Sequence, residues 1–346
     1  MTSPLTSDRT RHEAGSLGAS QAAGGPPRQS QSLAWARLGR AIGRQWLLTL
    51  AVAVLVAAAG VAFDYSGGVR AIVATQFWAP VALAVGLAVG AVNELRRNTI
   101  TSISSFGKHR GYAVLGAAPE LTENALRQLP PDKRTPIGCL AFLPASPFAT
   151  AFRDLQGALE NQRIVSFVGA LADDGATTTA LCAAVSAAQQ GRSVIIIDCD
   201  LRRRGLTRAL EYDVEAGVLE ASAEPDRWRS FIAEEEETGL HFLPAARLRN
   251  PWKTLAGSRG FPALIDALSE AYDLVVLDCP PALGAAEGVV LAGMAEKAVV
   301  VAVWDRTQLG AVRNAMRSLR RRPHLETGVW VNRVPPRYRF GRLRPD

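Results

Sequence analysis

Lysine is almost absent from this 346-residue sequence, although the formal net charge is +7. Lysine and arginine together number 39, and only four are lysine, which leaves 35 arginines. The lysines are Lys108, Lys133, Lys253 and Lys297, so none occurs between residues 134 and 252. Any phosphate-binding loop in that interval therefore has to work without a lysine.

Cysteine is also scarce, with four residues that lie far apart in apolar or strand-like contexts: Cys139, Cys182, Cys199 and Cys279. Zinc sites and disulfide frameworks use cysteines at short paired spacings, which this sequence lacks. We therefore expect neither kind of site. The four thiols are interpreted as small buried side chains in a reducing compartment.

Charged residues are missing from two apolar runs near the N-terminus, residues 46–63 and 71–93. Runs of this length are suited to cross a hydrocarbon layer about 30 Å thick. Arginines flank the pair on both outer sides, whereas the short loop between the runs holds only Arg70. The positive-inside rule then predicts a transmembrane hairpin over residues 45–97, with both termini cytoplasmic. A signal peptide or a buried core helix remains the alternative for the first run.

The segments around this hairpin lack apolar periodicity. Residues 1–44 are rich in Ser, Gly, Gln and Pro, which predicts a disordered basic tail. Residues 98–145 contain scattered Pro and Gly and are interpreted as a juxtamembrane linker with one short strand. Residues 335–346 form a second basic tail, which either binds anionic lipid headgroups or is simply solvated. In the second apolar run, Gly86 and Gly90 have the spacing that allows two helices to pack closely, which would favour a homo-oligomer.

From residue 146 to residue 334, strand-like apolar runs alternate with segments of helical length. This alternation is typical of an α/β fold with a doubly wound parallel sheet covered on both faces. The expected strands are Arg163–Val168, Ser193–Ile197, Leu240–Leu243, Leu274–Leu277, Ala298–Val303 and Val329–Val331. The expected helices are Thr177–Gln190, Phe261–Ala271, Ala285–Met294 and Gly310–Arg321.

The first of these strands runs into a loop with the character of a phosphate-binding loop. Its sequence, GALADDGATTT, leads into a helix, the arrangement in which backbone N–H groups cradle phosphates. The motif requires a small residue, four free positions, Gly, Lys, and Ser or Thr. Ala170, Gly175 and Thr177 fit this motif, but Ala176 stands in the lysine position. The predicted nucleotide contacts are these four residues and Thr178, although the loop alone is also compatible with an ordinary strand-to-helix turn.

Acidic residues end two further strands. The run IIIDCDLRRR places Asp198 and Asp200 at the carboxyl end of one strand, and YDLVVLDCPP places Asp278 at the end of another. Open parallel sheets bind ligands at this edge. Asp198, Asp278 and the Thr177 hydroxyl are oxygen donors suited to Mg²⁺. Each aspartate alone is compatible with a helix cap or a solvated turn, but three strand-end motifs in this order predict a P-loop site for ATP and Mg²⁺.

Together, GALADDGATTT, IIIDCDLRRR and YDLVVLDCPP resemble the Walker A, Walker A′ and Walker B motifs of the bacterial tyrosine kinases (BY-kinases) of capsule and exopolysaccharide systems. SPFATAFRDL, GLHFLPA and VWVNRV resemble further parts of that catalytic domain, so the resemblance covers about residues 146–334. It implies a P-loop NTPase-like fold, catalytic roles for Asp198 and Asp200, and contact between Asn332 and the base. It also implies a location at the bacterial inner membrane and a partner, either a polysaccharide co-polymerase or the export machinery.

The sequence departs from this family at positions that serve kinase activity. Ala176 replaces the phosphate-binding lysine. The assembly helix of the family carries an acid and two arginines, and the matching residues here are Thr150, Arg153 and Gln156. The tyrosine cluster of the family's tail is reduced to Tyr338. These losses predict a membrane-anchored, catalytically impaired BY-kinase-like component that regulates or scaffolds exopolysaccharide or capsule synthesis and export.

Two alternative functions keep part of the family's activity towards ATP. One is a weakly active autokinase or ATPase, and another is ATP binding without turnover. In either, Arg163 or Arg192 would contribute the missing charge, although neither lies on the loop. A positioning ATPase of the ParA or MinD type is disfavoured, because Leu171 stands where those proteins carry a second lysine. A nucleic-acid partner is not expected, because no aromatic platform accompanies the arginines.

Overall fold

The computed structural model describes residues 99–100, 111–248, 250 and 252–336, together with seven separate positions nearer the N-terminus: Val54, Leu55, Ala58, Pro80, Val81, Ala84 and Val85. The chain divides into two compact units, residues 1–97 and 98–346. The predicted hairpin falls almost wholly outside the described residues, as do the two predicted tails, so all three stay predictions. Within the part of the chain that is described, no helix has the length and apolar character needed to span a membrane.

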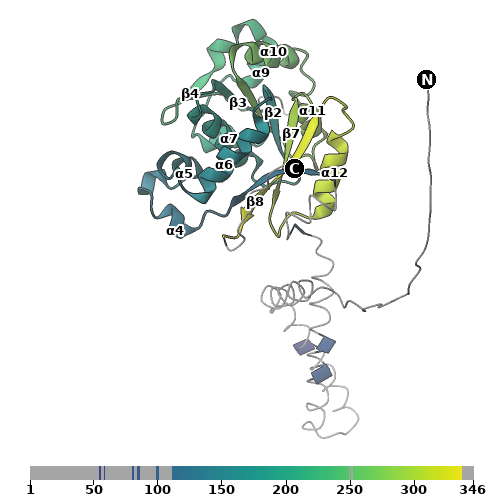
Figure 1. Ribbon diagram of the computed structural model, residues 1–346. Coiled ribbons are helices and arrows are strands. Elements are labelled where there is room, and N and C mark those ends of the chain that lie inside the picture. The colour runs from purple at the N-terminus through teal and green to yellow at the C-terminus, as the bar shows by residue number, and fades with distance from the viewer. Residues whose placement is uncertain are drawn as a thin grey trace, which may run out of the picture. The chain divides into compact units, whose positions relative to one another are not determined.

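An eight-stranded sheet forms the centre of the second unit (Figure 1). The strands are β1 (Ala113–Pro119), β2 (Ile164–Gly169), β3 (Val194–Asp198), β4 (Ala233–Glu235), β5 (Leu240–Leu243), β6 (Leu274–Cys279), β7 (Lys297–Val303) and β8 (Glu326–Val334). Their order is β1-β8-β7-β2-β6-β3-β5-β4, and every neighbouring pair is parallel except β4 with β5. The predicted parallel sheet is therefore confirmed.

Helices pack on both faces of this sheet, as a doubly wound fold requires. The helices are α4 (Glu123–Leu126), η1 (Pro131–Lys133), α5 (Pro136–Phe142), α6 (Pro147–Leu159), α7 (Ala176–Gln189), α8 (Gly205–Ala209), α9 (Val218–Ala223), η2 (Pro225–Phe231), α10 (Phe261–Ala271), α11 (Ala286–Ala292) and α12 (Leu309–Leu319). One hydrophobic core joins α5, α6 and α7 to the sheet, and a second joins α9, α10, α11 and α12 to it.

Alternation along the central strands explains the two cores. In β2, Val165 and Phe167 belong to the core under α5, α6 and α7, whereas Val168 belongs to the opposite core. In β6, Val276 and Leu277 divide in the same way. Successive strand residues point to opposite faces, and a parallel sheet covered on both faces needs apolar residues on each. The apolar runs used to predict these strands are the sequence signature of that burial.

The described part of the predicted linker, residues 98–145, packs into the domain. It supplies β1, the edge strand beside β8, and α5. Ile100 is buried, and the Thr99 hydroxyl donates a hydrogen bond to Asp305 Oδ1 (3.1 Å). Gly116 has a φ of +152°, and a Cβ there would lie 2.7 Å from the Trp330 ring of β8. The one short strand expected in this segment is β1. Its limits were not predicted, because Gly and Pro interrupt the apolar pattern and its partner is distant in the sequence.

Candidate nucleotide-binding site

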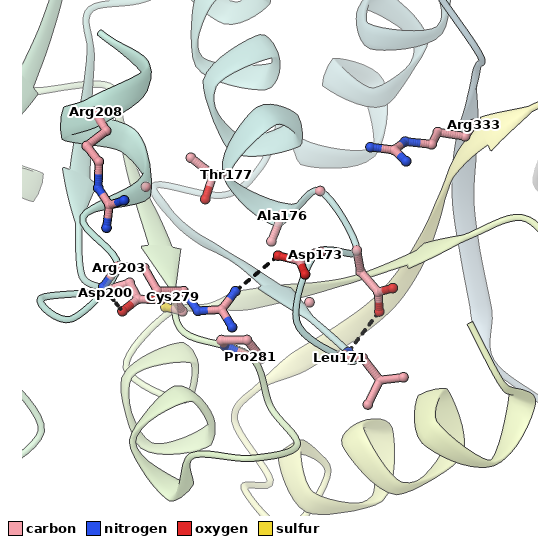
Figure 2. A pocket seen from close by; sticks show the side chains of 14 residues that line it. Leu171, Asp173, Ala176, Thr177, Asp200, Arg203, Arg208, Cys279, Pro281 and Arg333 are labelled. Carbon is pink, nitrogen blue, oxygen red and sulfur yellow. Dashed lines mark hydrogen bonds and ion pairs between the residues drawn. The ribbon is translucent and has the colours of Figure 1, made fainter. Parts of the chain in front are cut away.

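The loop between β2 and α7 meets the helix at a left-handed glycine. Gly175 is the N-cap, with a φ of 82°, and α7 begins at Ala176. The first N–H groups of a helix have no partner within it and carry a partial positive charge. Together with residues after β3 and β6, the loop and the first turn of α7 border a cavity of about 600 Å³ (Figure 2). The cavity therefore lies at the carboxyl edge of the parallel strands, where the sequence places it.

Hydrogen bonds to the Asp174 carboxylate fix the conformation of the loop. Its Oδ2 accepts a hydrogen bond from the Leu171 backbone N–H (2.8 Å), and its Oδ1 accepts one from the Thr307 hydroxyl beyond β7 (2.6 Å). Burial raises the pKa of Asp174, and the hydrogen bonds from Thr307 and Leu171 oppose that rise. The loop is thereby tied to the neighbouring strand, and one of its N–H groups is already used by a carboxylate.

Asn332 supports the same loop from β8, which differs from the predicted contact with a base. Its Nδ2 donates to Thr179 Oγ1 (2.8 Å) and to the Asp174 carbonyl oxygen (3.2 Å). Its Oδ1 accepts a hydrogen bond from Trp330 Nε1 (2.8 Å). Both ends of the amide are therefore used inside the protein, and Asn332 is not among the residues that line the cavity. It is a positioning residue for the loop.

The other predicted loop contacts divide into two groups. Gly175, Ala176 and Thr177 line the cavity. Ala170 is fully buried and its N–H donates to a carbonyl oxygen of β7 (2.9 Å), so this N–H is not available to a phosphate. Thr178 is exposed on α7 and is not among the lining residues.

Asp198 and Asp278 are register partners on the neighbouring strands β3 and β6. Asp198 is fully buried, and its Oδ2 accepts hydrogen bonds from the Thr207 N–H (2.9 Å) and hydroxyl (2.7 Å). Burial raises the pKa of Asp198 to about 6; the Thr207 hydrogen bonds lower it and the Asp200 charge raises it further. Asp200 lines the cavity, whereas Asp198 stands behind it and holds the following turn in place.

Asp278 is the aspartate of the site whose carboxylate oxygens lack hydrogen-bond partners among the described residues. The residue is only 1% exposed, and neither carboxylate oxygen has a hydrogen-bond partner of ordinary geometry among the described residues. Burial, followed by repulsion from Asp198, raises the pKa of Asp278 well above its usual value. The Thr177 hydroxyl lies near enough to oppose this rise. A carboxylate in such surroundings is well suited to a cation.

The donor atoms at this point fit a magnesium ion that arrives with a ligand. Within the described ranges, no three His, Cys, Asp or Glu side chains converge closely enough to hold a metal by themselves. Mg²⁺ in nucleotide sites is usually bound by one or two carboxylates together with phosphate and water oxygens. Asp278 and the Thr177 hydroxyl offer such a partial set, which phosphate and water oxygens would complete.

Arginines supply the positive charge around the cavity. Arg203, Arg208 and Arg333 line it, and Figure 2 shows them around the loop, with Arg208 and Arg333 at opposite sides of the view. Arg163 and Arg192, which the sequence suggested as sources of this charge, lie elsewhere. Both lie at the opposite end of the sheet, before β2 and β3, where their side chains donate to backbone carbonyl oxygens. The run after Asp200 contained the signal for Arg203, whereas Arg333 comes from a strand distant in the sequence.

The degenerate assembly positions lie on α6, where they make contacts within the chain. The Arg153 guanidinium donates to Thr150 Oγ1 (2.9 Å). Gln156 is buried, and its Nε2 donates to the Ala183 carbonyl oxygen of α7 (2.9 Å). Gln156 therefore helps to pack α6 on α7.

A mostly parallel sheet, a strand-to-helix loop at its carboxyl edge and aspartates on neighbouring strand ends define a P-loop NTPase-like domain. A family model described as an AAA domain matches residues 163–311. EpsB of Ralstonia solanacearum, whose name assigns it to the tyrosine-protein kinases, is 27% identical over 276 residues, covering 76% of this chain and 37% of EpsB. The succinoglycan biosynthesis transport protein ExoP of Rhizobium meliloti is 28% identical over 184 residues, covering 51% of this chain and 23% of ExoP.

Solved structures show the same fold. The kinase domain of the Escherichia coli tyrosine kinase ETK aligns with a TM-score of 0.61 and 23% identity, covering 71% of this chain and 100% of that domain. The BceF tyrosine kinase domain aligns with a TM-score of 0.58 and 22% identity, covering 68% of this chain and 100% of that domain. This chain spans little more than a third of EpsB, 37%. Its motifs and these relatives support a relationship to the BY-kinase family of capsule and exopolysaccharide systems.

Proposed function

We propose that this protein is a kinase-impaired member of the BY-kinase family that regulates or scaffolds exopolysaccharide or capsule synthesis and export. We further propose that the hairpin predicted over residues 45–97 anchors it in the bacterial inner membrane with both termini in the cytoplasm. The partner would be a polysaccharide co-polymerase or the export machinery, and the protein would act as a homo-oligomer. The names of EpsB and ExoP, which refer to a tyrosine kinase and a transport protein, support such a pathway role.

The observation that carries this proposal is the methyl side chain of Ala176 at the first position of α7. Phosphoryl transfer depends almost entirely on positioning and on charges that stabilise the transition state. No lysine in the described part of the chain lines the cavity. Lys133 pairs with Glu237, and Lys297 donates to the Ala158 carbonyl oxygen (2.8 Å). The cation used by the active members of the family is therefore not replaced by a lysine from elsewhere in the described fold.

Nucleotide binding without efficient turnover is the second candidate function, and Asp278 favours it. Its buried carboxylate without a hydrogen-bond partner lies beside the Thr177 hydroxyl at the edge of the cavity. Such a group is costly to the folded protein and gains a partner when Mg²⁺ is bound. In this case ATP would act as a ligand that assembles or regulates the protein. Any weak ATPase or autokinase activity would then be what remains of the ancestral kinase reaction.

The test is an assay of autophosphorylation and ATP hydrolysis by the full chain in detergent, with the ETK kinase domain as positive control. We expect rates at least about 100-fold below that control, because removing one transition-state donor costs about this much. Ala176→Lys should raise ATP turnover. Gln189→Lys, which adds the same charge at the far end of α7, should not. Wild-type turnover close to that of the ETK domain would refute the proposed impairment.

A further inference from the structure

The charged side chains of the phosphate-binding loop and of the ends of β3 and β6 are all acidic. Asp173 and Asp174 come from the loop, Asp200 follows β3, and Asp278 is buried beside them. The N-terminus of α7 offers only about half a positive charge. A ligand with several phosphate groups would be repelled by this arrangement unless cations from other elements stood close by. The identity of those cations therefore decides whether the cavity accepts a polyanion.

Arg333 is directed to the cavity by an unusual backbone conformation. Its φ is 55°, in the left-handed region that residues with side chains seldom adopt. Such strain outside glycine tends to occur at functional sites, where the surrounding structure maintains it. Arg333 lines the cavity and is exposed, and its guanidinium has no hydrogen bond or ion pair with any residue of the described ranges. Among the described residues, Arg333 is thus a cation without a paired anion.

Arg208 is a second exposed arginine on the cavity wall, and its side chain likewise has no partner among the residues described. It lies on α8, which follows a firmly held turn. Arg204 is buried at the N-cap of α8 and donates to the Ala245 carbonyl oxygen (2.7 Å) and to Asp213 Oδ1 (3.2 Å). The backbone that presents Arg208 is therefore anchored, although the Arg208 guanidinium itself is free to meet a ligand.

Arg203, from the same turn, already holds an anion of the loop. Its Nη1 lies 3.3 Å from Asp173 Oδ1, and Figure 2 shows this pair next to Ala176. The two side chains are 51% and 72% exposed. Exposed ion pairs contribute little to stability, so a phosphate group competes with Asp173 at small cost. The planar guanidinium also has further N–H donors that match phosphate oxygens in a forked geometry.

We propose that Arg203, Arg208 and Arg333 bind the phosphate groups of a nucleoside di- or triphosphate and take over the ligand-holding role of the missing lysine. Arg203 would exchange the Asp173 carboxylate for a phosphate, and the other two arginines would close the cavity from its sides. The inference rests on the second candidate function, nucleotide binding without efficient turnover. Contacts from the cavity wall hold the ground state of the ligand, and uniform binding of this kind does not accelerate chemistry.

The experiment measures dissociation constants for Mg·ADP, Mg·ATP and inorganic tripolyphosphate with Mg²⁺, using the full chain in detergent and titration calorimetry. The variants are Arg203→Gln, Arg208→Gln, Arg333→Gln and the triple change. Arg313→Gln is the matched control, because Arg313 is an exposed arginine on α12 that does not line the cavity. Each cavity variant should weaken nucleotide binding about tenfold or more, since hydrogen bonds to charged groups are the strong ones. The control should stay within about twofold of the wild type.

Salt dependence gives a second readout that a merely structural role would not change. Raising ionic strength should weaken binding by the wild type more than by the triple variant, because charge contacts are screened. Tripolyphosphate should bind more weakly than ATP; equal affinity would overturn the assignment to a nucleotide. Unchanged nucleotide binding by the triple variant, or no binding by the wild type at millimolar nucleotide, would overturn the inference. Kinase activity close to that of the ETK domain would instead refute the proposed impairment and leave the arginine assignment standing.

Discussion

Replacing Asp278 by asparagine should stabilise the protein at neutral pH in the absence of divalent cations. The substitution keeps the size of the side chain and removes a charge that is buried without a hydrogen-bond partner beside Asp198. A buried charge without a partner costs several kcal/mol, whereas a neutral amide costs less. Under the proposed function, the fold loses some stability by keeping a carboxylate that would bind a cation, as functional sites commonly do.

The sign and size of the effect follow from the pKa of Asp278, which burial raises well above the ordinary value of 3.8. Between the ordinary pKa of the unfolded chain and the raised pKa of the folded protein, the folded protein keeps a proton on Asp278 that the unfolded chain has released. Stability therefore falls by about 1.4 kcal/mol for each pH unit as the pH rises through this window. The asparagine variant has no carboxyl group to ionise and avoids this loss.

The assay is urea denaturation of wild type and Asp278→Asn between about pH 5 and 8, with and without Mg·ADP. The advantage of the variant should grow with pH, and Mg·ADP should stabilise the wild type more than the variant. Asp226→Asn is the control, because Asp226 is exposed and its substitution should change stability by less than about 0.5 kcal/mol. An Asp278→Asn protein that is less stable than wild type at neutral pH, or a stability difference independent of pH, would refute the reasoning.

Two further predictions concern the packing that supports the site. Gly116→Ala should lower the free energy of unfolding in urea by about 1–3 kcal/mol, because the alanine Cβ would lie 2.7 Å from the Trp330 ring. The control is Gly157→Ala in helix α6, which has open space around it and should be neutral or stabilising. Equal effects of the two substitutions would contradict this prediction. Thr207→Val should cost about 1–3 kcal/mol, because the lost hydroxyl donates to Asp198 Oδ2 (2.7 Å). Thr207→Ser should restore most of that loss, and a stable valine variant would show that this hydrogen bond contributes little.

Elements with a clear local pattern were predicted well. The helix predicted over Phe261–Ala271 has the same limits in the structure, and the strand predicted over Leu240–Leu243 does too. In both, apolar residues recur at the spacing of a single kind of element. For residues 98–145 one short strand was expected, but neither its limits nor its place in the sheet. Strand β1 is set by pairing with β8 and by the close approach of Trp330 to Gly116. Such non-local contacts leave little trace in a short window of sequence.

The candidate site shows the same division. Asp198 and Asp278 were expected at one edge of the sheet because parallel strands align their carboxyl ends, and they are register partners. The sequence did not reveal that Asp198 has hydrogen-bond partners while Asp278 has none. It also suggested a base contact for Asn332, whose amide instead braces the loop. The roles of polar side chains depend on which donors and acceptors surround them after folding.

The sequence by itself determined the parallel α/β fold, the loop at its carboxyl edge and the alanine in the place of a lysine at Ala176. These features depend on the order of residues and on local apolar periodicity, which can be read directly from the chain. Only the tertiary structure decided which carboxylate lacks a partner and which arginines face the cavity. Arg203 and Arg333 lie far apart in the sequence, and they line one cavity because β8 lies in the same sheet as β3. Long-range packing therefore decides which charged side chains meet at this cavity.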